Sequence, residues 1–201
     1  MSFEAVCPYT DAEQPATPIN LDFVRAVLSG LEQENKAIPS RFFYDARGSE
    51  LFEEITTLPE YYPTRTEIQI LTKRAADIAA DTPADSVLIE FVSGSSVKTE
   101  LLLASLPDLY AYVPIDISTS ALDDASKRLT KHFPALRVLP IVGDFSRPLD
   151  LDEGLRHRPR IGFFPGSTIG NLNNNEAVEL LQSMANLLGP GSRLIIGVDL
   201  K

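Results

Sequence analysis

From residue 86 onward, short apolar runs alternate with stretches of helical period, and this alternation constrains the fold more than any other feature. Uninterrupted apolar runs of this length are typical of strands buried on both faces. Strands that alternate with helices need crossover connections, which give a parallel sheet covered by helices on both sides. The sequence therefore predicts an α/β fold with a doubly wound parallel sheet. The runs expected to form strands are 86–92, 109–116, 136–144, 160–166 and 192–200.

The region before the first strand has a helical pattern instead. Residues 20–34 and 48–57 predict two short helices, because their apolar side chains recur at helical spacing. Thr64 and Glu67 form the T-x-x-E pattern of a capping box, which predicts the start of a third helix that runs to Ala80. The N-terminal part of the chain is therefore expected to be mostly helical.

Composition narrows the classes of function. The chain has 201 residues and a formal net charge of −10, without a basic stripe, so we expect neither nucleic acid nor an anionic membrane surface as a partner. No apolar run approaches the roughly 18 residues of a membrane-spanning helix. The single cysteine, Cys7, forms no internal disulfide, and the N-terminus lacks the layout of a secretory signal. We therefore expect a cytoplasmic monomer, and the few histidines and cysteines predict no metal site.

Acidic residues stand at the ends of three predicted strands, and this pattern carries the chemistry. Glu90, Asp116 and Asp144 should meet at one edge of a parallel sheet, where ligands bind in open α/β folds. A turn of small residues, 93–96, follows the first of these acids. Asp116 lies 22 residues after Gly94, the spacing of an acid that accepts hydrogen bonds from a ribose diol. The alternative is that Asp116 caps the helix that follows it.

The other strand ends indicate which nucleotide is bound. Asp144 and Phe145 offer an acceptor for an exocyclic amine and a ring for stacking, which suit adenine; the alternative is a turn aspartate beside a core aromatic residue. The glycine patterns that cradle phosphates are absent. S-adenosylmethionine, which has no phosphate, fits this set. Lys98 is placed to meet its carboxylate, unless that lysine is simply solvated.

At these residues the sequence closely resembles the histidine-specific methyltransferases that depend on S-adenosylmethionine, the L-histidine Nα-methyltransferases of ergothioneine biosynthesis. The resemblance runs from about residue 20 to the last residue, and Y-D-x-x-G-S-x-L-F and L-P-E-Y-Y-P-T-R carry it most specifically. The further matching strings are "LIEFVSGSSVKTELLL", "YVPIDISTSAL", "VGDFSRP", "GFFPGSTIGN" and "LGPGSRLIIGVDLK".

This resemblance implies a class I methyltransferase with a Rossmann-like fold. Residues 1–83 would form the helical N-terminal part of a substrate domain, and residues 84–201 the domain that binds S-adenosylmethionine. The implied reaction is methyl transfer to the α-amine of L-histidine, which forms hercynine. Fungal relatives methylate a prenylated tryptophan, so a related amino acid remains open as the substrate.

The resemblance also implies roles for individual residues. Tyr44 is expected to approach the cofactor and the amine as the catalytic residue, and Tyr61 to meet the imidazole. Gly166 and Asn171 match the segment that binds the α-carboxylate of the substrate. Surface positions for the tyrosines and a helix cap for the asparagine are the alternatives. The expected cofactor contacts are Glu90, Val92, Ser93, Gly94, Lys98, Asp116, Asp144 and Phe145.

Two features depart from the family pattern E-[LF]-G-S-G-[ST]-S. Val92 stands at the first glycine, where glycine permits a positive φ and a close approach of the backbone to the ligand. If φ is positive there, valine costs more than the roughly 1–2 kcal/mol typical of a residue with a Cβ. The family also continues beyond the last residue, Lys201, so we expect a C-terminally shortened chain. A catalytically inactive fragment or variant of the family is the alternative.

Overall fold

The computed structural model describes residues 20–43, 46–92, 97–145 and 149–200. The chain divides into two units, Met1–Phe43 and Tyr44–Lys201. The residues predicted as catalytic, Tyr44, and as part of the cofactor turn, Ser93 and Gly94, lie outside the described residues.

The first unit contains helix α1 (Leu21–Glu32) and the 3-10 turn η1 (Ser40–Phe43). Asn20 caps α1, because its side-chain oxygen accepts hydrogen bonds from the N–H groups of Asp22 and Phe23, both at 3.1 Å. These bonds satisfy donors that have no partner within the first helical turn. The predicted first helix is confirmed, and Asn20 is the cap at which it begins.

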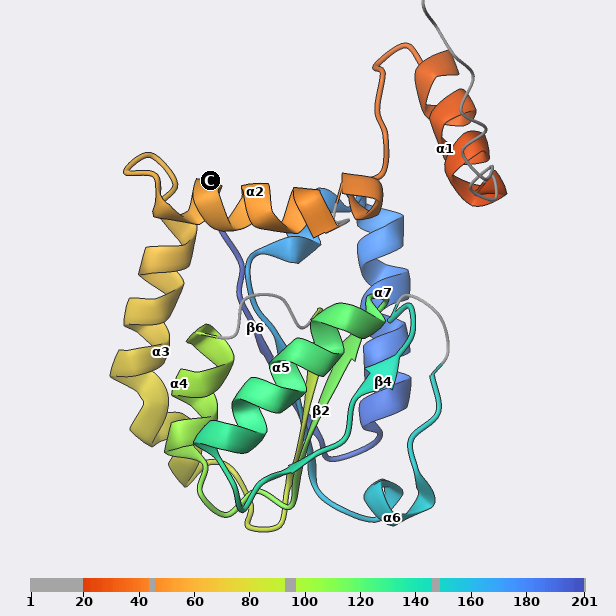
Figure 1. The fold of residues 1–201 in the computed structure, drawn as a ribbon. Coiled ribbons are helices and arrows are strands. Elements are labelled where there is room, and N and C mark those ends of the chain that lie inside the picture. The colour runs from red at the N-terminus through yellow and green to blue at the C-terminus, as the bar shows by residue number, and fades with distance from the viewer. Residues whose placement is uncertain (1–19, 44–45, 93–96, 146–148, 201) are drawn as a thin grey trace, which may run out of the picture. The chain divides into compact units, whose positions relative to one another are not determined.

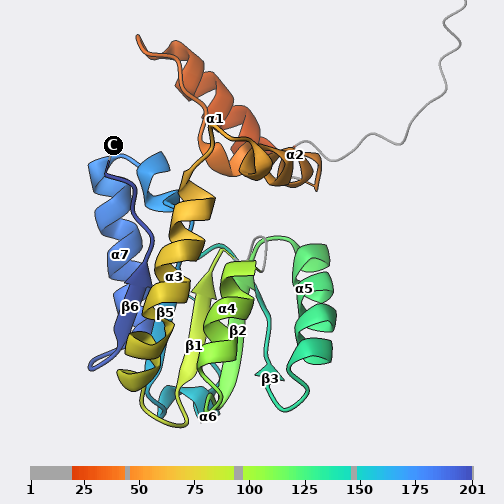
Figure 2. The ribbon, with the colours of Figure 1, turned by 90° about the vertical axis from the view of Figure 1, so that its left-hand side faces the viewer.

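A parallel sheet forms the centre of the second unit (Figures 1 and 2). Six strands are found in the described residues, and their order is β3-β2-β1-β5-β6, with β4 paired to β2 beside β3. Every pair is parallel, which confirms the predicted sheet. The strands are β1 (Val87–Phe91), β2 (Ala111–Asp116), β3 (Arg137–Val138), β4 (Ile141–Val142), β5 (Arg160–Phe164) and β6 (Arg193–Ile196).

Helices cover both faces of this sheet. Helices α3 (Pro63–Ala80), α4 (Val97–Ser105) and α5 (Thr119–His132) pack on one face. They do so through a cluster of buried residues that includes Leu71, Leu102 and Leu129. Helices α6 and α7 pack on the other face, where Leu155 and Met184 belong to the second cluster. Two helical layers thus enclose the sheet, as the doubly wound fold requires. The helical elements of this unit are α2 (Ala46–Thr57), α3 (Pro63–Ala80), α4 (Val97–Ser105), α5 (Thr119–His132), α6 (Glu153–Arg156), η2 (Thr168–Asn171) and α7 (Asn174–Leu188).

Strand β1 lies in the middle of the sheet and is buried along its whole length. Its alternate residues face opposite sides, as the pleat of a strand requires. Val87, Ile89 and Phe91 enter the cluster on the α6–α7 side, whereas Leu88 enters the cluster on the α3–α5 side. Glu90 shares the side of Leu88, so the strand carries one carboxyl group into an apolar layer. Burial on both faces explains why the sequence shows a continuous apolar run.

The third predicted strand, 136–144, is not continuous. It consists of β3 and β4, which pair with the first and the last part of β2, and the chain leaves the ladder between them at Leu139 and Pro140. Proline has no N–H to donate to a sheet ladder, so the pairing is interrupted at that point. The prediction of a single strand was therefore wrong in its extent, although its place in the sheet is correct.

The predicted capping box at the start of the third helix was also wrong. Helix α3 begins at Pro63, one residue before Thr64, and Tyr62 occupies the cap position without a side-chain hydrogen bond. Proline is favourable at the first helical position because the N–H that it lacks would be unpaired there anyway. The carboxylate of Glu67 is therefore not needed at the helix start, and it contacts other elements instead.

Candidate functional site

The carboxyl ends of β1, β2 and β5 lie side by side, because these strands are parallel neighbours in the sheet. Glu90 and Val92 stand at the end of β1, Asp116 at the end of β2, and Gly166 just after β5. Lys98 joins them from the first turn of α4. The structure thus gathers residues from distant parts of the sequence at one edge of the sheet, as expected for an open α/β fold.

Val92 adopts a backbone conformation that glycine usually provides. Its φ is +68°, in the left-handed region, and its half-buried side chain packs against the cluster on the α6–α7 side. A β-branched residue is strained in this region, because its Cβ crowds the following carbonyl group. Val92 therefore has the positive φ that glycine adopts most easily, and it holds this conformation at a cost in strain.

Glu90 is buried near the end of β1, with 2% of its surface exposed. Its carboxylate accepts hydrogen bonds from the hydroxyl of Thr99 at 2.9 Å and from the hydroxyl of Tyr112. Burial raises the pKa of Glu90 to about 7, although the hydrogen bonds and the nearby charge of Lys98 oppose this rise. Glu90 therefore ties the end of β1 to α4 and β2 from inside the protein. Direct contact with a cofactor stays a prediction.

Asp116 is half-buried at the end of β2, and burial raises its pKa above the ordinary value for aspartate. Its carboxylate accepts a hydrogen bond from the N–H of Ser118 at 2.8 Å. Ser118, not Asp116, is the N-cap of α5, since its hydroxyl accepts from the N–H of Ala121 at 3.3 Å. The alternative that Asp116 caps the helix is therefore wrong, and the predicted contact with a ribose remains.

Asp144 and Phe145 follow β4 and are half-buried. The ring of Phe145 lies 6.0 Å from the ring of Phe164 at a tilt of 54°, and it packs against the cluster on the α6–α7 side. The carbonyl oxygen of Phe145 accepts a hydrogen bond from Ser183 at 3.4 Å. One side of this aromatic residue thus belongs to the core, as one of the two interpretations expected. Stacking on adenine stays a prediction.

Lys98 does not stand alone at the site. Its ammonium nitrogen lies 2.6 Å from Oε2 of Glu67, and the exposed fractions of the two side chains are 12% and 16%. The backbone N–H of Gly166 donates to both carboxylate oxygens of Glu67, at 2.9 and 3.0 Å. Sequence reasoning missed Glu67 because its spacing from Thr64 matched a capping box. The signal against that interpretation was Pro63, since the helix begins there with its N-cap at Tyr62, two residues before the cap that Thr64 would provide.

The turn after β5 holds the residues predicted for the substrate. Gly166 has φ +85°, and the next residue, Ser167, has φ +56°. Asn171 ends the 3-10 turn η2 and is exposed. The hydroxyl of Ser167 accepts a hydrogen bond from the N–H of Asp199 at 2.9 Å, and the hydroxyl of Tyr62 donates to that aspartate at 2.6 Å. This turn is therefore connected to the segment after β6.

Tyr61 precedes α3 and packs against an aromatic residue of α2. Its ring lies 5.9 Å from the ring of Phe52, nearly perpendicular to it at 84°. Such edge-to-face pairs are favourable because the positive ring edge meets the negative ring face. Tyr61 is half-buried, which is consistent with the alternative of an amphipathic surface residue. Its contact with an imidazole stays a prediction.

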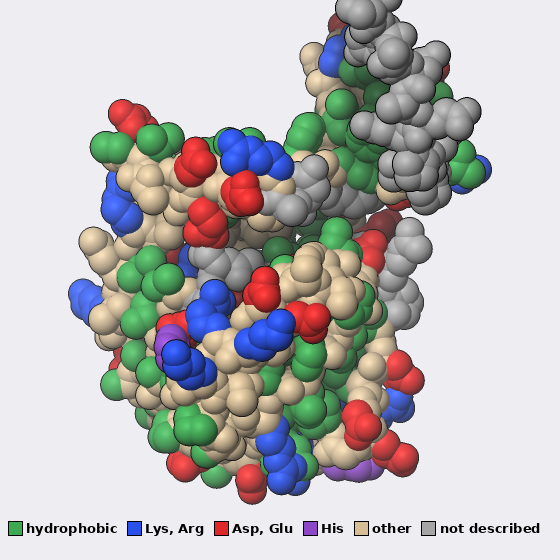
Figure 3. Space-filling view, in the orientation of Figure 1, with side chains coloured by type: hydrophobic (Ala, Val, Ile, Leu, Met, Phe, Trp, Pro, Cys, Tyr) green, Lys and Arg blue, Asp and Glu red, His purple; other side chains and the backbone are tan. Residues whose placement is uncertain are grey.

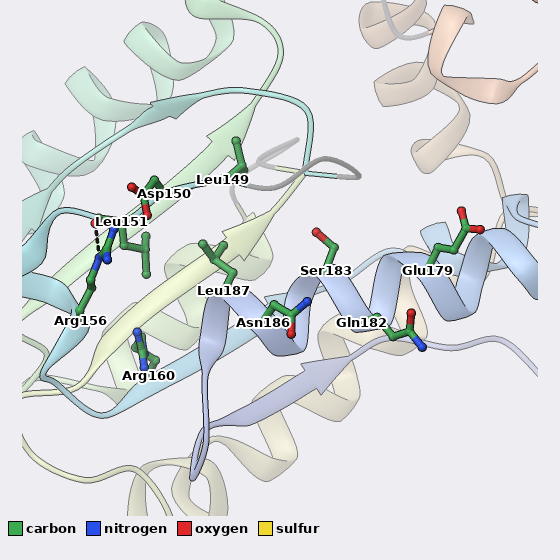
Figure 4. A pocket seen from close by; sticks show the side chains of 10 residues that line it. All are labelled: Leu149, Asp150, Leu151, Arg156, Arg160, Glu179, Gln182, Ser183, Asn186 and Leu187. Atoms are coloured by element: carbon green, nitrogen blue, oxygen red, sulfur yellow. Dashed lines mark hydrogen bonds and ion pairs between the residues drawn. The ribbon is translucent and has the colours of Figure 1, made fainter.

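Two cavities accompany this arrangement. One, of about 260 Å³, lies between α3 and the ends of β5 and β6, and Glu67, Gly166 and Asp199 line it. A larger groove of about 430 Å³ lies along α7, where Arg156 and Asp150 form an ion pair (Figure 4). No predicted site residue lines this larger groove. Of the predicted site residues that the structure describes, Gly166 alone lines the smaller cavity, so the assignment of the chemistry to the strand ends stays a prediction.

The donor set at the strand ends fits S-adenosylmethionine at most points. Asp116 offers acceptors for ribose hydroxyls, and Lys98 keeps further N–H donors for a carboxylate beside its bond to Glu67. The position that fits least well is Val92, whose branched side chain occupies a backbone conformation suited to glycine. In the part of the chain that the structure describes, no group of three metal-ligating side chains is found.

The surface and the helices add two observations. On the face drawn in Figure 3, lysine and arginine side chains are interspersed with aspartate and glutamate, the pattern of a solvated surface. None of the described helices has both the length and the apolar character that crossing a membrane requires.

Comparison with known proteins gives the family. Residues 23–201 match the histidine-specific methyltransferases that depend on S-adenosylmethionine. The chain belongs to this family. It is 42% identical over 183 residues to a histidine N-alpha-methyltransferase of Mycolicibacterium smegmatis, a match that covers 88% of this chain and 55% of that protein. The chain thus spans about half the length of the curated bacterial relatives that it matches.

A fungal relative and a solved structure agree with this assignment. The chain is 32% identical over 194 residues to ergothioneine biosynthesis protein 1 of Neurospora crassa, a match that covers 94% of this chain and 22% of that protein. The structure of mitomycin 7-O-methyltransferase matches with a TM-score of 0.50 and 17% identity, covering 88% of this chain and 48% of that one. At this identity the structural likeness shows the Rossmann-like fold alone.

Proposed function

We propose that this protein is an S-adenosylmethionine-dependent N-methyltransferase that acts on the α-amine of L-histidine, the step that forms hercynine in ergothioneine biosynthesis. The observation that carries the proposal is the match to the histidine-specific family over residues 23–201. The strand-end residues support it, because they offer acceptors for a ribose and a cation for a carboxylate. The substrate is a small amino acid, and the lone cysteine suits a reducing cytoplasm.

In the proposed reaction the neutral amine attacks the methyl carbon of the sulfonium in line. A nitrogen–carbon bond forms, the sulfur–carbon bond breaks, and the sulfur keeps the electron pair as a neutral thioether. The methylated amine then releases a proton to water and can attack again. Hercynine is a trimethylated amine, so its formation needs three such transfers from three molecules of S-adenosylmethionine, and the third transfer leaves no N–H proton to release. Most of the acceleration comes from holding two reactants in the attacking geometry and from excluding water. No covalent intermediate on the protein is needed.

The cofactor side of the proposal uses residues at the ends of β1, β2 and β4. Asp116 would accept hydrogen bonds from the ribose, and Lys98 would meet the carboxylate of the amino acid end. Asp144 and Phe145 would bind and stack adenine. The turn that includes Val92 would then set how closely the backbone approaches the cofactor. Glu90 would support this end of β1 through its hydrogen bonds with Thr99 and Tyr112.

The substrate side uses the N-terminal region and the turn after β5. Tyr44 would orient the amine, and Tyr61 would contact the imidazole. Gly166 and Asn171 would bind the α-carboxylate. Residues 1–83 would contribute to the substrate domain, and residues 84–201 would bind the cofactor. This division follows the proposed roles rather than the two structural units.

The decisive experiment is a calorimetric titration with S-adenosylhomocysteine of this chain, of Val92→Gly and of Asp116→Ala as the negative control. Saturable binding by the first two and its loss in the third would support the proposal. Binding by Val92→Gly alone would mean that the valine blocks an otherwise complete site. If neither binds while circular dichroism shows both folded, the proposed cofactor site is wrong.

Substrate identity needs a separate assay. The protein would be incubated with S-adenosylmethionine and L-histidine, and methylated products followed by mass spectrometry. L-tryptophan and a prenylated tryptophan would serve as competing amines. Preferential methylation of histidine supports the proposed substrate. Preferential methylation of the tryptophan amines would contradict it while leaving the methyltransferase chemistry intact.

A further inference from the structure

We propose that Glu67 is a positioning residue that connects the cofactor side of the site to the substrate side. The inference rests on the proposed function, because its two partners, Lys98 and Gly166, are the residues assigned there to the cofactor carboxylate and the substrate carboxylate. Glu67 itself would touch neither ligand. It would act by fixing the lysine and the turn after β5 relative to each other.

The contacts of Glu67 reach three separate elements. The residue belongs to α3, its Oε2 lies 2.6 Å from Nζ of Lys98 at the start of α4, and both oxygens accept from the N–H of Gly166 after β5. Lys98 lies 31 positions from Glu67 in the sequence, and Gly166 lies 99 positions away. One carboxylate therefore fixes two segments that the chain itself does not hold together.

The space for this carboxylate depends on glycine. A Cβ built on Gly197 would lie 1.8 Å from Oε1 of Glu67 and 3.2 Å from the backbone nitrogen of Gly166. A Cβ on Gly166 would lie 3.5 Å from Nζ of Lys98. Side chains at Gly197 would thus displace the carboxylate. The segments after β5 and β6 are therefore shaped to admit the side chain of Glu67.

The pair of Glu67 and Lys98 differs from the ion pairs on the surface of α2 and of α3 itself. Arg47 with Glu50, and Arg74 with Asp77, join residues three positions apart, and their side chains are more than half exposed. Exposed pairs of that kind contribute little, because solvent screens them. The ion pair between Glu67 and Lys98 is mostly buried, so the surrounding side chains restrict its geometry. Each of the two buried charges is stabilised by the other, and removal of either would leave the remaining charge without compensation.

This geometry predicts which part of the cofactor depends on Glu67. The ammonium of Lys98 has three N–H donors, so one can bond to Glu67 while the others meet a ligand carboxylate. Glu67 then determines where those other donors point. Its loss should weaken recognition of the amino acid end of the cofactor, and recognition of the adenosine end should be unchanged.

The test compares two probes by calorimetry. S-adenosylhomocysteine has the amino acid end, and 5′-methylthioadenosine has the same adenosine and sulfur without it. Glu67→Ala should lower the affinity for S-adenosylhomocysteine by on the order of tenfold, since it removes bonds to a charged partner, and should leave the affinity for 5′-methylthioadenosine unchanged. Glu67→Gln should recover part of the affinity, because its amide oxygen still accepts from Gly166.

Two further variants make the result unambiguous. Gly197→Ala should reproduce the selective loss without altering Glu67, because it moves the carboxylate, so the proposal stays testable if Glu67→Ala does not fold. Glu100→Gln is the matched control: it removes a carboxylate that pairs with Arg128 on the outer side of α4, and it should leave both affinities unchanged.

The outcomes separate this inference from the proposed function. Equal losses for both probes, or no loss in the Glu67 and Gly197 variants, would overturn the positioning role while the unaltered protein still binds. Failure of the unaltered protein to bind either probe would instead contradict the proposed cofactor site, and the role of Glu67 would be lost with it. Selective loss for S-adenosylhomocysteine supports the role.

Discussion

The ends of β1 and β5 meet the same geometric demand with different residues. Both strands turn through a positive φ just beyond the sheet, at Val92 with +68° and at Gly166 with +85°. Within the sheet, near these ends, Glu90 of β1 lies opposite Phe163 of β5, and both side chains are buried. The end of β1 thus combines a buried carboxyl group with a strained valine, whereas β5 has a phenyl ring and a relaxed glycine.

This difference shows that the position in the fold, rather than the residue, sets the backbone conformation. The sheet requires both turns, so the chain adopts the left-handed region even where a β-branched side chain opposes it. The polar and strained groups are concentrated at the end of β1. Substitutions that make the two ends alike should therefore change stability in opposite directions.

The largest effect on the free energy of unfolding is expected for Glu90→Gln, which makes this position neutral, as Phe163 is in β5. In the folded state burial raises the pKa of Glu90 from 4.5 to about 7, so the folded protein holds a proton that the unfolded chain has released. The free energy of unfolding should therefore fall as the pH rises between these two values, by about 3 kcal/mol, and stay at the lower level above them. Glu90→Gln should lack this fall.

Urea unfolding at pH 5 and pH 8 measures this difference directly. The free energy of unfolding of Glu90→Gln, relative to that of the unaltered protein, should be about 3 kcal/mol higher at pH 8 than at pH 5. Glu50→Gln, at an exposed acid on α2 that pairs with Arg47, serves as the control and should show no such difference. Parallel pH profiles for the unaltered protein and Glu90→Gln would mean that Glu90 is charged in the folded state.

The second largest effect is expected when the glycine after β5, Gly166, is replaced by valine, the residue that follows β1. Gly166→Val should lower the free energy of unfolding by about 2 kcal/mol, because a β-branched residue must adopt φ +85°. It should also weaken binding of L-histidine, since Lys98 and Thr168 lie 3.5 Å from the added Cβ. Denaturation and titration with L-histidine measure the two effects. An unchanged stability would show that the turn after β5 relaxes to accept valine.

The converse exchange should stabilise the protein by a smaller amount. Val92→Gly removes the strain at φ +68° but loses the packing of the valine and the restriction that it places on the unfolded chain. We expect a net gain of about 1.5 kcal/mol in the free energy of unfolding. A lower midpoint of urea unfolding for this variant would mean that packing outweighs strain at this turn.

The smallest effect isolates backbone strain from crowding. Gly191 has φ +77°, and a Cβ there would have no atom within 4 Å. Gly191→Ala should therefore cost about 1 kcal/mol or less, from the left-handed conformation alone. The same unfolding measurement checks it. A cost as large as that of Gly166→Val would show that crowding contributes nothing measurable at the turn after β5.

Much of the fold could be predicted from the sequence, because its strongest signals are local. The continuous apolar run of β1 was interpreted correctly, since burial on two faces leaves a clear mark in the residue types. The break at Pro140 and the short helix α6 were missed. Both depend on how the chain crosses the ends of β2, which local patterns do not reveal.

The candidate site was predictable only in part for the same reason. The positions of Asp116 and Gly166 at one edge of the sheet follow from the alternation of strands and helices alone, because parallel strands end on the same side. The bond between Glu67 and Lys98 could not be predicted, because the local pattern of Glu67 had a simpler meaning and its real partners are distant in sequence. Pro63 argues against a cap at Thr64, but no residue near Glu67 in the sequence indicates that Lys98 and Gly166 are its partners.

The order of strands in the sheet also affects how the chain is assembled during synthesis. Val87 of β1 pairs with Ala111 on one side and with Arg160 on the other. The ribosome therefore completes the first pair long before the second, and β1 has an unpaired apolar edge while the intervening chain is made. Such edges promote aggregation, and non-local pairing slows folding. The emerging chain is thus most vulnerable in the interval before β5 appears.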